Sequence, residues 1–288
     1  MNEKFNENIE SVNHESIYHY CGFNTFFEII KNKTIRLSDI TQSNDHDEIK
    51  WSAHIIINAF DNYYDKIFKK EEEIKIAKEI IQNNIEYFIE NKTYSVLACC
   101  FSEKKDLLSQ WRGYSEDGKG FSIGYSSKMI SELINEIDTK NCKIIFGKVS
   151  YEEDTQIAII NSEIRKFFSE NDIDNIDDFD KNVPILFENL FEKIIYFKNP
   201  FFSEECEWRV CLLYKSSEYL NIKINDENLD FYTSCNKIIP FVDLPFENKK
   251  GIMIDVMCGP KNKAEKIKDF LGINNIVCNV YESKGTYR

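Results

Sequence analysis

A short polar segment, Glu205-Cys206-Glu207-Trp208-Arg209, carries the side chains best suited to chemistry in this chain. As a strand over Glu205 to Leu213, it places one apolar face on Cys206, Trp208, Val210 and Leu212. Glu207 and Arg209 then share the opposite face. An ionised carboxylate there could stabilise a developing positive charge, but the pair is equally typical of an ion pair on a solvated sheet face.

His19 is the second candidate. It lies in a strand predicted over Ser16 to Cys21, because apolar and aromatic residues alternate there. A neutral imidazole donates one hydrogen bond and accepts another, so His19 is either a ligand contact or a hydrogen-bonded core histidine. The apolar spacing after this strand predicts an amphipathic helix that stops near Asn32, followed by a strand from Thr34 to Ser38.

Three aromatic residues in the middle of the chain could stack on a planar ligand. Phe101 closes a strand predicted over residues 93–102, and Tyr114 ends a short helix predicted over residues 106–114. Trp111 lies within that helix. Packing in the core is the alternative for each of them, and we assign Trp111 to the core.

The elements around these residues predict a single α+β domain over residues 16–288, with a largely antiparallel sheet as its core. Two segments with helical patterns, at about 48–91 and 152–198, interrupt the strands as insertions. The polar residues 1–15 are expected to be disordered.

Composition narrows the class of protein. The 288 residues include 36 Lys and Arg against 49 Asp and Glu, and this net charge of −13 disfavours non-specific binding to duplex nucleic acid. No apolar run approaches a membrane span, and the acidic N-terminal residues do not form a secretory signal, so we expect a cytoplasmic protein that contacts no membrane. The nine cysteines show no metal-binding spacing and are expected to be reduced core residues, and no metal site is predicted.

Several motifs together resemble the bacterial DUF2971 domain family. They are Tyr18-His19-Tyr20, Ser43-Asn44-Asp45 with Glu48, Cys100-Phe101-Ser102, Gln110-Trp111-Arg112-Gly113-Tyr114, Gly120 to Gly124, Glu205 to Arg209, and Tyr287-Arg288. The family carries no settled activity. The resemblance implies a place among bacterial toxins or antiviral defence effectors.

A second, more distant resemblance rests on the order of local features. Along the chain come Tyr18-His19 on a first strand, an immediate helix, the strand end Phe101-Ser102, a helix ending in Gly113-Tyr114, and a late strand with Glu207. This order resembles the ADP-ribosyltransferases of the His-Tyr-Glu class, typified by diphtheria toxin. It implies an ADP-ribosyltransferase-like fold that takes NAD as substrate, although the two helical insertions have no counterpart in the toxin.

The residue types suit that chemistry. Glu207 would be the catalytic carboxylate, because breaking the nicotinamide bond develops positive charge on the ribose. His19 would hydrogen-bond the adenosine-side ribose. Tyr114 and Phe101 would form aromatic walls around the cationic nicotinamide, although Phe101 stands where the toxin has a tyrosine.

The pyrophosphate of NAD needs a cationic partner, and Arg36, Arg112 and Arg209 are the candidates. The predicted function is transfer of ADP-ribose from NAD to a macromolecule, protein or nucleic acid, or hydrolysis of NAD. Neither the acceptor nor the choice between these two reactions follows from the sequence.

Two alternatives belong to other classes. The first is a metal-dependent nuclease with Asp45, Asp47, Glu48 and Glu207 as ligands, because clustered carboxylates suit hard cations. The second is a non-catalytic module that senses or binds a nucleotide in the same cleft.

Overall fold

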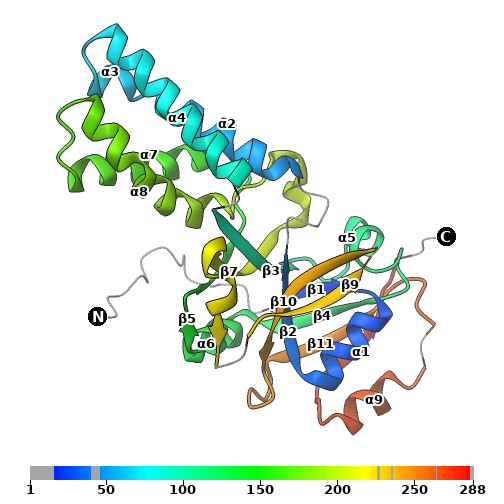
Figure 1. Ribbon diagram of the computed structural model, residues 1–288. Coiled ribbons are helices and arrows are strands. Elements are labelled where there is room, and N and C mark those ends of the chain that lie inside the picture. The colour runs from blue at the N-terminus through cyan, green and yellow to red at the C-terminus, as the bar shows by residue number, and fades with distance from the viewer. Residues whose placement is uncertain are drawn as a thin grey trace.

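A computed structural model describes residues 16–39, 46–91, 93–225, 228–234, 236–263 and 265–285. These residues form a ten-stranded sheet with a bundle of helices beside it (Figure 1). The structure confirms an α+β fold with a mostly antiparallel sheet. The segment 1–15, which we expect to be disordered, lies outside the described residues.

The sheet runs in the order β12, β11, β4, β1, β3, β2, β10, β9, while β7 pairs with β3 and β6 pairs with β7. Its strands are β1 (Ser16–Cys21), β2 (Thr34–Asp39), β3 (Tyr94–Ser102), β4 (Phe121–Ser126), β6 (Lys143–Lys148), β7 (Glu207–Lys215), β9 (Asp230–Ser234), β10 (Lys237–Pro245), β11 (Met253–Cys258) and β12 (Asn279–Glu282). β11 and β12 pair in parallel. A separate two-stranded sheet joins β5 (Thr139–Lys140) to β8 (Lys223–Ile224).

The sheet divides at β3. β7 pairs with β3 along its whole length, so it occupies one edge of that strand. The other edge is shared, because β1 pairs with Ser102 and β2 pairs with Leu97 and Ala98. Between these two pairings, residues 99–101 have neither strand opposite them. This gap leaves a backbone carbonyl free to bind a side chain.

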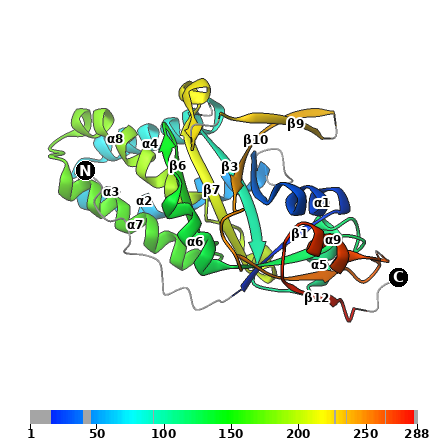
Figure 2. The same ribbon diagram turned by 90° about the horizontal axis from the view of Figure 1, so that it is seen from below.

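Three helices pack against the sheet. α1 (Phe23–Asn32) and α9 (Ile267–Ile273) lie on the side away from the bundle, and α6 (Ser127–Glu136) lies nearer to the bundle (Figures 1 and 2). α1 buries Phe26, Ile29 and Ile30 because these positions share one helix face, and it ends where Lys33 adopts the left-handed conformation. Together with the strands, these helices enclose the main hydrophobic core.

Helices also occupy both segments that the sequence analysis treats as insertions. They are α2 (His46–Asp61), α3 (Tyr64–Ile67) and α4 (Glu71–Asn91) in the first segment, and α7 (Glu153–Glu170) and α8 (Ile176–Ile194) in the second. The two insertions pack against each other into one bundle with its own hydrophobic core. Within the described ranges, no helix is long and apolar enough to cross a membrane.

The two faces of the β3–β7 pair have different neighbours. Leu97, Cys99 and Phe101 on β3 face the main core with the alternate residues of β7. On the other face, apolar residues such as Ala98 and Cys211 pack against the end of α8. Further along this second face the side chains become polar, and it is there that the candidate site lies.

The expected strand from Glu205 starts later in the structure. β7 begins at Glu207, because Glu205 ends the 3₁₀ helix η2 (Pro200–Glu205) and Cys206 takes a left-handed backbone with φ of 45°. A second 3₁₀ helix, η3 (Ser216–Asn221), follows β7 directly. The helix expected after β3 is present as α5 (Leu108–Tyr114).

The turn that leads from α5 into β4 gives a first prediction. A Cβ at Gly120 would overlap the carbonyl oxygen of Cys21 and the hydroxyl of Ser115, so Gly120→Ala should lower the free energy of unfolding by about 1–3 kcal/mol. A Cβ at Gly272 in α9 would meet no atom within 4 Å apart from its chain neighbours and its own helix backbone, so Gly272→Ala should be neutral or stabilise by up to about 1 kcal/mol. Urea unfolding of both variants checks this, and equal midpoints would contradict the close approach at Gly120.

Candidate functional site

A cavity of about 640 Å³ opens beside the gap in the sheet. Residues from β1, α1, β2, β3, α5, β7, β9 and β10 line it, joined by Glu48 of α2 and by Lys198 and Glu205 from the segment between α8 and β7. Six of the predicted site residues are among them: His19, Arg36, Phe101, Tyr114, Glu207 and Arg209. The structure therefore brings together His19 on the first strand and Glu207 on the late strand, as the sequence analysis expects.

His19 is fixed by the gap in β3. Its Nδ1 lies 2.9 Å from the carbonyl oxygen of Cys100, which has no strand partner on that edge. Because a carbonyl only accepts, Nδ1 carries the proton and Nε2 is left as an acceptor. Burial lowers the pKa of His19, and the bond to Cys100 offsets this only in part, so the ring is neutral. His19 thus presents an acceptor of fixed orientation.

Glu207 and Arg209 form a buried pair on one face of β7, with 5% and 2% of their surfaces exposed. Arg209 Nε donates to Glu207 Oε1 at 2.7 Å, and Nη2 donates to Oε2 at 3.1 Å. The alternative of an ion pair on a solvated sheet face is therefore wrong. The face is covered by the helical bundle, whose α2 brings Glu48 onto the same guanidinium.

Arg209 has no donor left for a ligand. Its remaining N–H groups bond both carboxylate oxygens of Glu48, at 2.8 and 3.1 Å, and the carbonyl of Ile195 at 2.7 Å. With the two bonds to Glu207, all five donors of the guanidinium are used. This corrects the expectation that Arg209 could bind the pyrophosphate, and makes it a positioning residue for Glu207 and Glu48.

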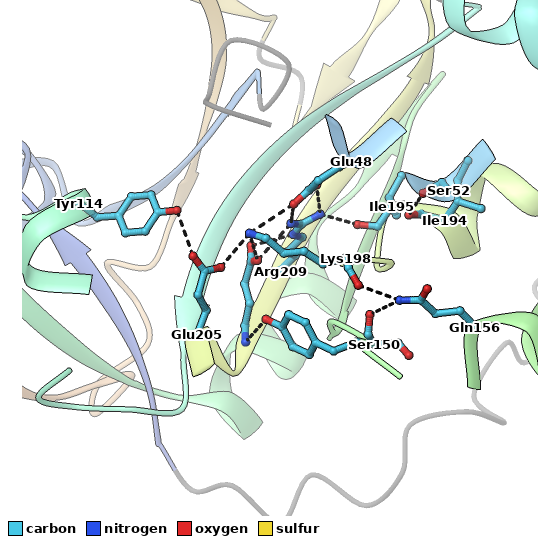
Figure 3. Close-up of polar contacts among 12 residues, drawn as sticks. Glu48, Ser52, Tyr114, Ser150, Gln156, Ile194, Ile195, Lys198, Glu205 and Arg209 are labelled. Atoms are coloured by element: carbon cyan, nitrogen blue, oxygen red, sulfur yellow. Dashed lines mark hydrogen bonds and ion pairs between the residues drawn. The ribbon is translucent and has the colours of Figure 1, made fainter. Parts of the chain in front are cut away.

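Lys198 completes the charged cluster (Figure 3). Its ammonium lies 2.8 Å from Glu205, 3.1 Å from Glu207 and 3.3 Å from Glu48. Two cations thus face three carboxylates, and the cluster carries a formal charge of −1. Lys198 is not among the residues predicted for the site, although a single lysine within the largely apolar run Ile194 to Phe202 is a signal of a buried, paired charge.

The cluster keeps Glu207 ionised. Burial alone would raise the pKa of Glu207, but Arg209 and Lys198 outweigh it and lower the pKa to about 2. At Glu48, by contrast, burial dominates and raises the pKa, because the same two cations offset it only in part. Burial and the charge of Glu207 also raise the pKa of Cys100, which lines the cavity as a neutral thiol.

Tyr114 stands at the edge of the cavity with 51% of its surface exposed. Its hydroxyl lies 3.5 Å from Glu205 Oε1, on the far side of that carboxylate from Lys198 (Figure 3). Packing in the core is therefore excluded for Tyr114. Its ring is accessible to a ligand that enters the cavity.

Phe101 and Trp111 are core residues. Only 2% of Phe101 is exposed, and its ring packs edge-on against His19 and Tyr125. Phe101 borders the cavity but its ring is buried, so it does not present the accessible ring face that we expected for contact with nicotinamide. Trp111 is buried as expected, and its indole N–H donates to Asp106.

The other two arginines differ in position. Arg112 is exposed and does not line the cavity, which corrects its expected role. Arg36 lines the cavity and donates from Nε and Nη2 to Asp243 at 2.9 and 2.8 Å. Its guanidinium also stacks over the ring of Phe241, 3.7 Å from the ring centre. Arg36 is thus the predicted arginine that lines the cavity outside the buried cluster of Glu48, Lys198, Glu205, Glu207 and Arg209.

Of the four carboxylates proposed for a metal-dependent nuclease, the two whose side chains the structure describes do not face an open position. Asp45 and the side chain of Asp47 lie outside the described residues. Glu48 and Glu207 are bound by Arg209 and Lys198 instead. Among the residues that the structure describes, no group of three His, Cys, Asp or Glu could hold a metal ion.

Comparison with known proteins supports one of the two resemblances. The model of a family described as "Protein of unknown function (DUF2971)" matches residues 110–210, which confirms that resemblance over this segment. The match contains most of α5 with Tyr114, the helices α7 and α8, Lys198, and the start of β7 with Glu207 and Arg209. No curated protein and no solved structure gives a significant match.

The buried cluster predicts unequal effects along β7. Arg209→Ala leaves Glu48 and Glu207 buried without their main partner, and should lower the free energy of unfolding by about 3–5 kcal/mol. Lys215 on the same strand pairs with Glu188 at 2.8 Å in an exposed position, so Lys215→Ala should cost less than about 1 kcal/mol. Chemical denaturation measures both, and a similar small loss would show that the cluster is not a stabilising unit.

Glu207 gives a prediction of pH dependence. Its pKa falls from 4.5 to about 2 on folding, so ionised Glu207 stabilises the native state above pH 4.5 and this stability is lost as pH falls toward 2. The shift corresponds to roughly 3 kcal/mol. Glu207→Gln should therefore be much less stable than the wild type at pH 7, and the difference should shrink between pH 4.5 and 2. A difference that stays constant over this range, in urea unfolding at each pH, would contradict the assignment.

Proposed function

We propose that the protein binds NAD in this cavity and cleaves its nicotinamide bond, with transfer of ADP-ribose to a macromolecule or to water. One observation carries the proposal: a neutral His19, an ionised Glu207 and an exposed Tyr114, from three separate elements, line one cavity at the division of the sheet.

The charge of the site suits the reaction. When the bond between ribose C1′ and the nicotinamide nitrogen breaks, its electron pair leaves with nicotinamide and positive charge develops on the ribose. Arg209 and Lys198 hold the carboxylate of Glu207 ionised and in place, so it needs no reorganisation to stabilise that charge. An acceptor hydroxyl, amide or water then bonds to C1′ and loses a proton.

Other residues of the cavity fit the rest of the dinucleotide. The Nε2 acceptor of His19 suits a ribose hydroxyl, and the exposed ring of Tyr114 suits the planar cationic nicotinamide. Arg36 is the arginine best placed for the pyrophosphate. In this proposal the protein is an ADP-ribosyltransferase or NAD glycohydrolase that acts as a bacterial toxin or defence effector in the cytoplasm, and its acceptor is a protein or a nucleic acid.

Nicotinamide release from NAD tests the proposal. Glu207→Gln should lower kcat by about 100-fold or more, because it removes the charge that the transition state needs. Tyr114→Ala should weaken NAD binding by about 1 kcal/mol or more, while Tyr114→Phe keeps most of the affinity because it keeps the ring.

A folding control and a label-transfer assay are needed to interpret the result. Glu207→Gln must be assayed at a temperature where circular dichroism shows it folded, because the loss of a buried charge destabilises it. Adenine-labelled NAD incubated with cell extract shows whether the label reaches protein, nucleic acid or free ADP-ribose. A wild-type protein that NAD stabilises against heat but that releases no nicotinamide would be a nucleotide-binding module instead. A fully active Glu207→Gln protein would end the proposal.

A further inference from the structure

Gln156 on α7 is a fully buried amide inside the helical bundle. Its Nε2 donates to the carbonyl oxygens of Ser150 and Lys198, at 2.6 and 2.9 Å. Its Oε1 accepts from the indole N–H of Trp51 on α2 at 2.9 Å. Both donors of the amide are used, and they bond two backbone segments that lead to the candidate site (Figure 3).

The backbone of Lys198 is held at both of its polar groups. Its N–H donates to the carbonyl of Ser150 at 3.1 Å, and its own carbonyl accepts from Gln156. The N–H of Ser150 donates in turn to the carbonyl of Tyr196 at 2.7 Å. Ser150 and Gln156 therefore fix the point from which the Lys198 side chain enters the cavity.

The ammonium of Lys198 depends on that fixed point. It lies between the carboxylates of Glu205 and Glu207, at 2.8 and 3.1 Å, and it is one of the two cations that keep Glu207 ionised. A lysine side chain has four rotatable bonds, so its charge is localised only when its backbone and its partners are both fixed.

Helix α2 contacts the same cluster from the bundle side. Glu48 and Trp51 are three residues apart and so share a face of α2, with Glu48 on Arg209 and Lys198 and Trp51 on Gln156. The bundle thus contacts the cluster directly through Glu48 and indirectly through Gln156.

We propose that Gln156 is a positioning residue: by holding the backbone of Lys198, it fixes the ammonium between Glu205 and Glu207. Through Gln156, the helical bundle then contributes to the activity of the site. This inference rests on the proposed cleavage of NAD. The bonds of Gln156 to two buried carbonyls also stabilise the fold, so the test compares Gln156 with a buried residue that stabilises the same helix without contacting Lys198.

Steady-state release of nicotinamide by the full chain tests the proposal. Gln156→Met keeps the volume but removes both donors, and should lower kcat by at least about tenfold while KM stays within about threefold. Lys198→Met should lower kcat at least as much. Because Gln156 acts through Lys198, adding Gln156→Met to Lys198→Met should change kcat by less than about twofold.

Ile160→Ala is the matched control. Ile160 is fully buried on α7 one turn from Gln156, so its truncation destabilises the bundle and leaves the amide bonds intact. It should leave kcat of the folded protein unchanged. The proposal fails if Gln156→Met keeps the wild-type kcat, if Ile160→Ala lowers kcat equally, or if the effects of Gln156→Met and Lys198→Met multiply.

Two further measurements cover the remaining cases. If Gln156→Met does not fold, Trp51→Phe removes the indole N–H that donates to the amide oxygen of Gln156, and its kcat should fall by at least about twofold. If the wild type releases no nicotinamide, the proposed function fails, and crystal structures of the wild type and Gln156→Met decide the positioning role. An Nζ of Lys198 still within hydrogen-bond distance of Glu207 in that variant would overturn it, and a displaced Nζ would support it.

Discussion

The guanidinium of Arg209 is the interaction on which the arrangement of this protein depends. Its five donors join β7, the start of α2 and the end of α8, through Glu207, Glu48 and the carbonyl of Ile195. A buried guanidinium is stable only with every donor satisfied, so these three elements must meet at one place. The sheet and the bundle are consequently fixed to each other at the wall of the cavity.

The cavity forms where one edge of β3 has no paired strand. Because β1 and β2 share one edge of β3 and leave residues 99–101 between them, the two parts of the sheet separate there. The carbonyl of Cys100, which lacks a strand partner on this edge, accepts a hydrogen bond from His19. The backbone group is therefore satisfied although the space between the two strands stays open. The same imidazole thus satisfies a backbone carbonyl and lines the cavity.

Local patterns in the sequence predict much of the fold and part of the site. The alternation along β7 places Glu207 and Arg209 on one face, and the order of the motifs leads to the meeting of His19, Tyr114 and Glu207. The covering of that face depends on Glu48, which is 161 residues away from Arg209 in the sequence. The residue pattern within β7 alone cannot predict this contact. The first residue of β7 could not be predicted either, because Cys206 just before it adopts a left-handed conformation that a residue other than glycine rarely takes.

The sequence of β3 likewise does not determine which way its two faces point. Its sequence is apolar on both faces, so it indicates a buried strand but does not say which face meets the core. Phe101 turned out to face the core, whereas Cys100 faces the cavity beside Glu207. The roles of two neighbouring residues therefore depended on a choice that only the tertiary contacts make.

The joint construction of the bundle from two distant insertions has a consequence for the order in which the chain can fold. The residues of α2 and α4 find their core partners on α7 and α8, and the bond from Trp51 to Gln156 spans 105 residues. During synthesis the apolar face of the first insertion therefore lacks its partners on α7 and α8 until these helices have left the ribosome. Contacts of such high sequence separation slow folding, and they leave the nascent first insertion exposed to chaperones and proteases during that interval.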